Sequence, residues 1–79
     1  MEAVVNTRHR VLRFLYDRRV ESPDSFFDEA DLDHCGEAKM VRAALVYGVE
    51  LGYIRKHRGH YRLTAPGMDY CERKVNNGD

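Results

Sequence analysis

Hydrophobic residues near the start of the chain recur at the spacing of an amphipathic helix. The segment "TRHRVLRFLYDRR" places its apolar side chains three or four residues apart, so that they share one helical face: Val11, Leu12, Leu15 and Tyr16. Arg8, Arg10 and Arg13 lie on the other faces.

The ends of this helix are less sharply marked. Its start has two candidates, a cap at Asn6 or Thr7 or a backward extension through Val4 and Val5. The polar segment around Pro23 predicts its end near Arg19 or Val20.

Two further helices are predicted before residue 52. The segment "SFF" favours a short extended stretch, and Asp28 with Asp31 then resembles an acidic capping box that starts a short helix. After Gly36, a longer helix over 37–51 divides into two faces. Its inner face is predicted to hold Val41, Ala44, Leu45, Gly48 and Leu51, with Gly48 packed against the first helix. Gly52 is placed to end it.

The segment "YIRKHRGHYRLT", residues 53–64, alternates as a β-hairpin does. A two-residue turn at Arg58 and Gly59 pairs position 57 with 60, 56 with 61, 55 with 62 and 54 with 63. Ile54, Tyr61 and Leu63 then share one face with Lys56. The other face holds Arg55, Arg62, His57 and His60, and two arginines directly opposite each other favour an anionic partner.

The remaining segment predicts a short C-terminal helix. Pro66 suits a helix start, and Met68 or Cys71 is the expected inward contact. No core residue is expected after Val75, so residues 1–75 are predicted to form one domain and 76–79 a flexible tail. The expected class is α+β and mostly helical.

Composition limits the function classes. The 79 residues include 13 basic and 13 acidic side chains, for a net charge of zero, and such a short chain has room for only a thin core. No apolar run approaches the roughly 18 residues needed to cross a bilayer, so no membrane partner is expected. The N-terminus lacks the pattern of a secretory signal, which predicts a cytoplasmic protein.

Neither metal binding nor catalysis is predicted. Cys35 and Cys71 form no C-x-x-C pair, and a metal site at His34 and Cys35 would have to recruit His60 or Cys71 through the fold. The histidines are scattered, no nucleophile stands beside a recognisable base, and no glycine-rich phosphate loop occurs. No cofactor is expected.

The order of predicted elements, together with two local motifs, resembles the winged helix-turn-helix family. The likeness runs from Thr7 to Lys74. Its most specific part is "LGYI" at 51–54, followed by "YRLT" at 61–64 and by Gly67. The resemblance implies a three-helix core, a two-stranded wing hairpin and a short closing helix.

The same resemblance implies a small DNA-binding protein of transcription-factor type. Helix 37–51 would enter the major groove with Lys39, Arg42, Ala43, Val46 and Tyr47. The wing 53–64 would contact phosphates with Arg55, Lys56, His57, Arg58, His60 and Arg62. The arginines of the first helix are further candidates. Double-stranded DNA is the expected partner, and a regulator of this size would bind two half-sites as a homodimer.

Two features favour an alternative, a winged-helix module that binds protein and not DNA. Ala43, Val46 and Tyr47 form an apolar patch suited to a protein partner or a dimer contact. Residues 21–37 hold seven acids and no lysine or arginine, which would repel a phosphate backbone. The dimer surface has three candidates: the first helix, the segment around Met68 and Tyr70, or the apolar patch.

Overall fold

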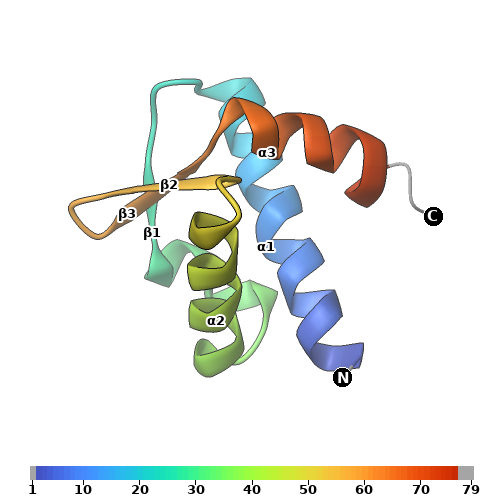
Figure 1. The fold of residues 1–79 in the computed structure, drawn as a ribbon. Coiled ribbons are helices and arrows are strands. Elements are labelled where there is room, and N and C mark those ends of the chain that lie inside the picture. The colour runs from blue at the N-terminus through green and yellow to red at the C-terminus, as the bar shows by residue number, and fades with distance from the viewer. Residues whose placement is uncertain (1, 77–79) are drawn as a thin grey trace.

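The first helix begins earlier than a cap at Asn6 or Thr7 would allow. The computed structural model describes residues 2–76, and α1 spans Glu2–Glu21 (Figure 1). Thr7 is buried, and its hydroxyl lies 3.8 Å from the sulfur of Met40. Because that hydroxyl is turned into the packing between helices, it does not cap a helix end. The backward extension is therefore the correct alternative.

The other elements follow in the predicted order. They are β1 (Phe27–Asp28), the 3-10 helix η1 (Glu29–Cys35), α2 (Ala38–Glu50), β2 (Ile54–His57), β3 (His60–Leu63), α3 (Ala65–Tyr70) and the π-helical turn η2 (Cys71–Val75). The predicted α+β class with a helical majority is confirmed. The part of the predicted tail at 77–79 lies outside the described residues.

The predicted capping box is present at the start of η1. Asp31 donates its backbone N–H to Asp28 Oδ1 at 3.2 Å, and Asp28 donates its own to Asp31 Oδ2 at 3.1 Å. Each carboxylate thus satisfies a backbone donor that the helix start leaves unpaired.

The sheet has three antiparallel strands and not only the two of a hairpin. Its order is β1-β3-β2, with Phe27 opposite Tyr61 and Asp28 opposite His60. A strand of two residues is too short to show alternation, but pairing with β3 satisfies its backbone groups. The predicted hairpin register, from Ile54 with Leu63 to His57 with His60, is confirmed.

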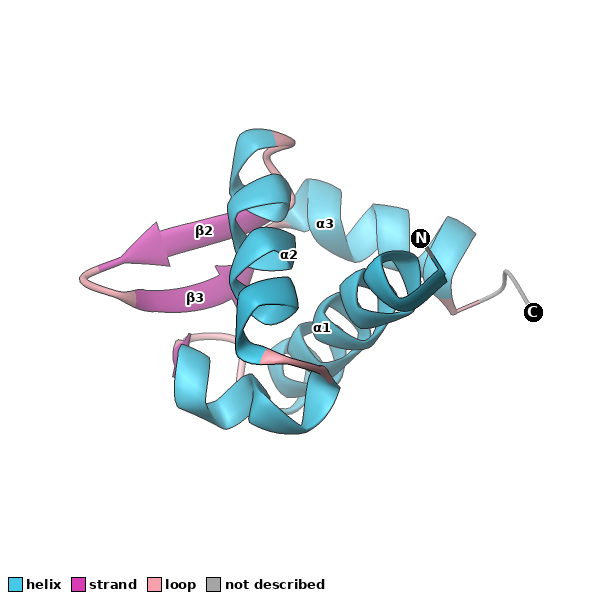
Figure 2. Cartoon of the chain, turned by 90° about the horizontal axis from the view of Figure 1, so that it is seen from below, coloured by secondary structure: helices cyan, strands magenta, loops and turns pink. Residues whose placement is uncertain are grey.

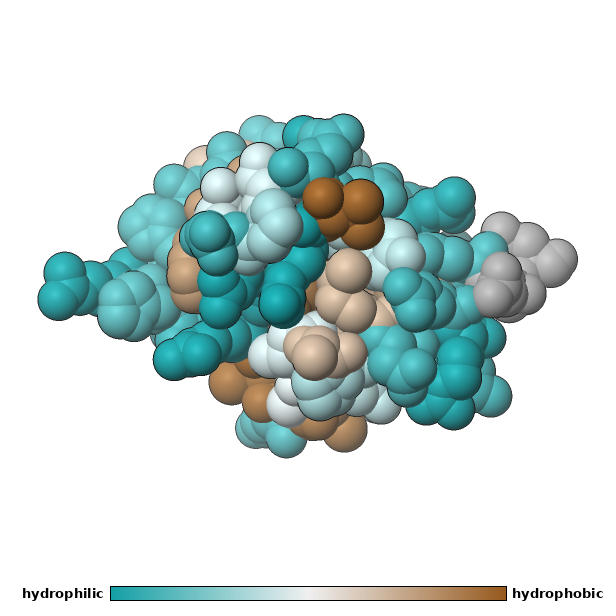
Figure 3. All heavy atoms as spheres, turned by 90° about the horizontal axis from the view of Figure 1, so that it is seen from above, coloured by the Kyte–Doolittle hydropathy of each residue, from teal (hydrophilic) through white to brown (hydrophobic). Residues whose placement is uncertain are grey.

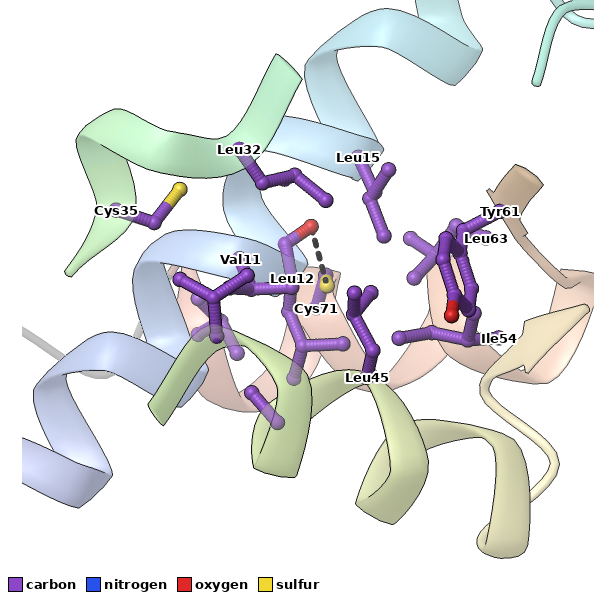
Figure 4. Packing of buried hydrophobic residues seen from close by; sticks show 13 residues of the cluster. Val11, Leu12, Leu15, Leu32, Cys35, Leu45, Ile54, Tyr61, Leu63 and Cys71 are labelled. Carbon is purple, nitrogen blue, oxygen red and sulfur yellow. Dashed lines mark hydrogen bonds between the residues drawn. The ribbon is translucent and has the colours of Figure 1, made fainter. Parts of the chain in front are cut away.

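The core lies where α1, α2, η1 and the sheet meet. Leu15, Leu32 and Leu45 are fully buried there and converge from three helices (Figure 4). Ile54, Tyr61 and Leu63 close the core from the sheet, on the face predicted for them. Cys71 joins from the start of η2, with its thiol 3.7 Å from the carbonyl oxygen of Leu12.

Two expectations for α2 are wrong. Leu51, placed on the inner face, is 46% exposed at the C-cap position, one residue after α2 ends at Glu50. Gly48 is buried as expected, but it faces the sheet. A Cβ there would lie 2.3 Å from Ile54 Cδ1, so the close packing is against β2 and not against α1.

The junction between α2, the hairpin and α3 depends on the motif residues. Gly52 has a φ of 81°, which an L side chain rarely adopts, and it ends α2 as predicted. The hydroxyl of Thr64 donates to the Gly52 carbonyl at 2.6 Å and accepts from the N–H of Gly67 at 3.1 Å, which caps α3. Tyr53 and Tyr70 stack beside this junction with ring centroids 4.6 Å apart.

Candidate nucleic-acid interface

The β2–β3 hairpin projects from the body of the protein (Figure 1). Its turn is formed by Arg58, with a φ of 52°, and Gly59, with a φ of 80°. Two successive left-handed residues make the type of turn whose twist matches paired strands. Seen from above, the projecting end at the left is hydrophilic, and the hydrophobic patches on this face are small and separate (Figure 3).

Most of the predicted wing cations are exposed on this hairpin. Arg55, Lys56, His57, Arg58 and His60 all face solvent. None of the ion pairs within residues 2–76 involves the hairpin. The hairpin therefore presents positive charge that no carboxylate in the described part of the chain offsets by a salt bridge.

Arg62 differs from the other five. It is half-buried, its guanidinium lies 4.5 Å from the centre of the Phe26 ring, and it donates to the Pro23 carbonyl at 3.3 Å. Phe26 also approaches His57, with ring centroids 5.8 Å apart. The Phe26 ring and the Pro23 carbonyl thus offset part of the repulsion between the opposed Arg55 and Arg62. Arg62 also holds the segment before β1 against the sheet.

The second predicted group gathers on the outer side of α2. Lys39, Arg42, Ala43, Val46 and Tyr47 line an open depression of about 420 Å³, together with Glu50. Seen from below, α2 lies between the hairpin and α1 (Figure 2). A smaller depression of about 150 Å³ separates Val46 and Val49 of α2 from Lys56 and Tyr61 of the hairpin. The structure therefore brings the two predicted groups together on neighbouring surfaces.

Two side chains on α2 already have partners within the chain. Arg42 forms a salt bridge with Glu29 at 3.1 Å, and the guanidinium of Arg8 lies 3.9 Å from the centre of the Tyr47 ring. The prediction omitted Glu50 from this face, although it stands three and four residues after Tyr47 and Val46, the spacing of one helical face. Arg8 could not be placed here from sequence, because its contact depends on how α1 packs on α2.

Several carboxylates of the acidic segment, residues 21–37, make contacts within the chain. Asp28 and Asp31 form the capping box, Glu29 pairs with Arg42, and Glu21 pairs with Arg18 at 2.7 Å.

On α1, Arg10 donates to the Cys35 carbonyl at 3.0 Å, so it supports the packing of η1. Arg13 lies apart from the hairpin and α2, in a depression with His9 and Val75.

The thiols are buried and protonated at neutral pH. Burial raises the pKa of the Cys35 thiol above its ordinary value and that of Cys71 to about 12. A thiol held neutral in this way is a poor nucleophile and a poor metal ligand. Within the described residues, no group of three or more His, Cys, Asp or Glu side chains is arranged to hold a metal ion.

Comparison with protein families, with curated proteins and with solved structures finds no significant match to this chain. Over the described residues, none of the helices has both the length and the apolar character needed to cross a membrane.

Proposed function

We propose that the protein is a winged-helix DNA-binding protein in which α2 lies in the major groove and the β2–β3 hairpin contacts phosphates. The order of helices and strands is compatible with that layout. In this proposal the protein acts in the cytoplasm as a transcriptional regulator, and pairs of chains occupy two half-sites.

The observation that carries the proposal is the charge on the hairpin. Five exposed basic or titratable side chains lie on a projecting hairpin and form no ion pair with any described residue. Guanidinium groups donate two parallel hydrogen bonds to phosphate oxygens, and the glycine at the tip permits close approach to a backbone. The DNA backbone is the partner whose charge best complements such a surface.

The first test is a titration of the protein into a labelled random-sequence duplex, followed by anisotropy at several salt concentrations. We expect log K to fall against log salt with a slope of about −3 to −5, as roughly four or five phosphate contacts would give. Absence of binding at low salt would contradict the proposal.

A charge-removing variant locates the contact. Arg55→Gln with Arg58→Asn removes two positive charges, and asparagine tolerates the left-handed backbone at position 58. We expect weaker binding to all sequences and a slope shallower by about 2. The matched control, Arg73→Gln with Lys74→Gln, removes the same charge from η2 and is expected to change the slope little.

One observation favours protein binding as a second candidate function. Arg42 is paired with Glu29, Tyr47 lies under Arg8, and Val46 is 53% exposed beside them. This leaves α2 with few groups free to read bases and with an apolar depression suited to another polypeptide. If the titration detects no binding at low salt, this candidate replaces the first.

A further inference from the structure

The outer face of α2 is exposed, partly apolar and open. Six residues line its depression of about 420 Å³: Lys39, Arg42, Ala43, Val46, Tyr47 and Glu50. Val46 and Tyr47 remain 53% and 41% exposed. An apolar surface of this kind on a small protein commonly marks a contact with another chain.

These six residues are symmetrically placed along the helix. The midpoint between Ala44 and Leu45 is equally distant from Lys39 and Glu50, from Arg42 and Tyr47, and from Ala43 and Val46. When two identical helices pack antiparallel about a two-fold axis at that midpoint, the residues near the centre of the face meet their counterparts, Lys39 with Glu50 and Ala43 with Val46. Arg42 and Tyr47 lie on opposite edges of the face and do not meet across the axis. Each of the two central pairs is then formed twice.

The chemistry of the two central pairs is complementary. Lys39 meets the carboxylate of Glu50, and the methyl group of Ala43 meets the larger Val46. The small side chain of Ala43 permits the close approach of two helix axes. A parallel arrangement would instead oppose lysine to lysine and glutamate to glutamate.

The contacts within the chain leave room for this arrangement. Arg42 pairs with Glu29 and Arg8 lies over the ring of Tyr47, so these edge residues keep their partners within the chain while Val46 stays 53% exposed for the contact. We propose that a second copy of this chain packs antiparallel on α2, with Lys39 of each copy opposite Glu50 of the other. The proposal does not depend on DNA binding.

The dimer is expected to be weak. One helix face buries less than the roughly 800 Å² per partner of a standard interface, so the chains should exchange rapidly between monomer and dimer. Sedimentation velocity over a series of protein concentrations, without nucleic acid, measures this equilibrium for the full chain.

Charge reversal tests the pairing itself. Lys39→Glu or Glu50→Lys alone opposes like charges at both ends of the interface, and each variant should dimerise about tenfold more weakly. When the two variants are mixed, each lysine again meets a glutamate, and dimers should return to the level of the unaltered protein. A parallel arrangement instead predicts that the single variants are not weakened and that the mixture dimerises more strongly than the unaltered protein, whereas contact through another surface predicts neither change.

The controls separate this test from loss of folding. Asp24→Lys and Lys74→Glu make equal charge changes at exposed positions away from α2, and neither should alter dimerisation. Two results would overturn the proposal: monomers at every concentration, which leaves the face to a different partner, or a mixture no better than the separate variants. Because the assay contains no DNA, its outcome is independent of the duplex titration.

Discussion

Gly67 and Gly59 show that two glycines in neighbouring elements can be required for different reasons. Gly59 has a φ of 80° and open space around the position of a Cβ, so its constraint is conformational. Gly67 lies in α3 with an ordinary helical backbone, but a Cβ there would lie 2.2 Å from the carbonyl oxygen of Tyr53. Its constraint is the space between α3 and the start of the hairpin.

This difference predicts that alanine lowers the free energy of unfolding by different amounts at the two positions. Gly59→Ala should lower the free energy of unfolding by about 1–2 kcal/mol, the cost of a left-handed alanine. Gly67→Ala should cost more, because a backbone carbonyl has to move and Leu63 Cγ, at 2.8 Å, cannot yield freely in a packed core. Urea unfolding of both variants measures the two costs, and an equal or smaller loss for Gly67→Ala would contradict this account.

At the scale of elements, β1 and the segment before it support the hairpin from one side. Arg62 of β3 lies over Phe26 and reaches the carbonyl of Pro23, while β1 pairs with β3 through Phe27 and Asp28. The hairpin is therefore anchored to the loop after α1, although its tip extends beyond these contacts.

Removing the Phe26 ring should loosen this anchor without removing charge. Phe26→Ala is expected to cost about 1–2 kcal/mol of stability for a half-buried ring and to increase amide hydrogen exchange in β3. Val20→Ala, which truncates an exposed apolar side chain in α1, is the control. Unchanged exchange in β3 would show that Phe26 does not hold the hairpin.

The same elements explain how far sequence reasoning reached. The hairpin register followed from alternation and the turn at Arg58 and Gly59, both of which are local. The pairing of β1 could not be predicted, because two residues carry no periodicity and the partner strand lies more than thirty residues away. The start of α1 stayed open between two alternatives because Thr7 resembles a cap in sequence, whereas its packing against Met40 decides for the backward extension.

The candidate site was predicted to a similar extent. Arg55, His57 and His60 are exposed, on the face that the hairpin register predicts for them. Lys56 is exposed as well, although the register places it on the face of Ile54. The partners of Arg42, Tyr47 and Arg62 were not predicted, since each comes from a distant segment brought close by the fold. The motif residues Gly52, Thr64 and Gly67 support one junction, which is why they point to a fold more strongly than to a function.

At the scale of the whole molecule, the two proposals use the same face of α2 and therefore compete. A helix that lies in the major groove is not available to a second copy, and a dimer joined through α2 cannot insert either helix. A dimer that binds two half-sites would need another surface, such as α1 or the region around Met68 and Tyr70.

A covalently locked dimer tests this competition. In a mixture of the single variants Ala43→Cys and Val46→Cys, the two thiols are opposed across the proposed interface and no chain holds both, so oxidation should join two copies while the buried native cysteines stay reduced. We expect the locked dimer to bind a duplex at least about tenfold more weakly than the same protein after reduction. Equal binding in both states would mean that the hairpin alone carries the DNA contact.

The stacked rings of Tyr53 and Tyr70 are an intrinsic fluorescence probe near the base of the hairpin. The chain contains five tyrosines and no tryptophan, so its ultraviolet emission is that of tyrosine alone. The Tyr53–Tyr70 stack lies where the hairpin leaves the body, beside the Thr64 hydroxyl that joins Gly52 to α3. We therefore expect a ligand that shifts the hairpin to change the overlap of these two rings, and with it the tyrosine fluorescence of the unlabelled protein.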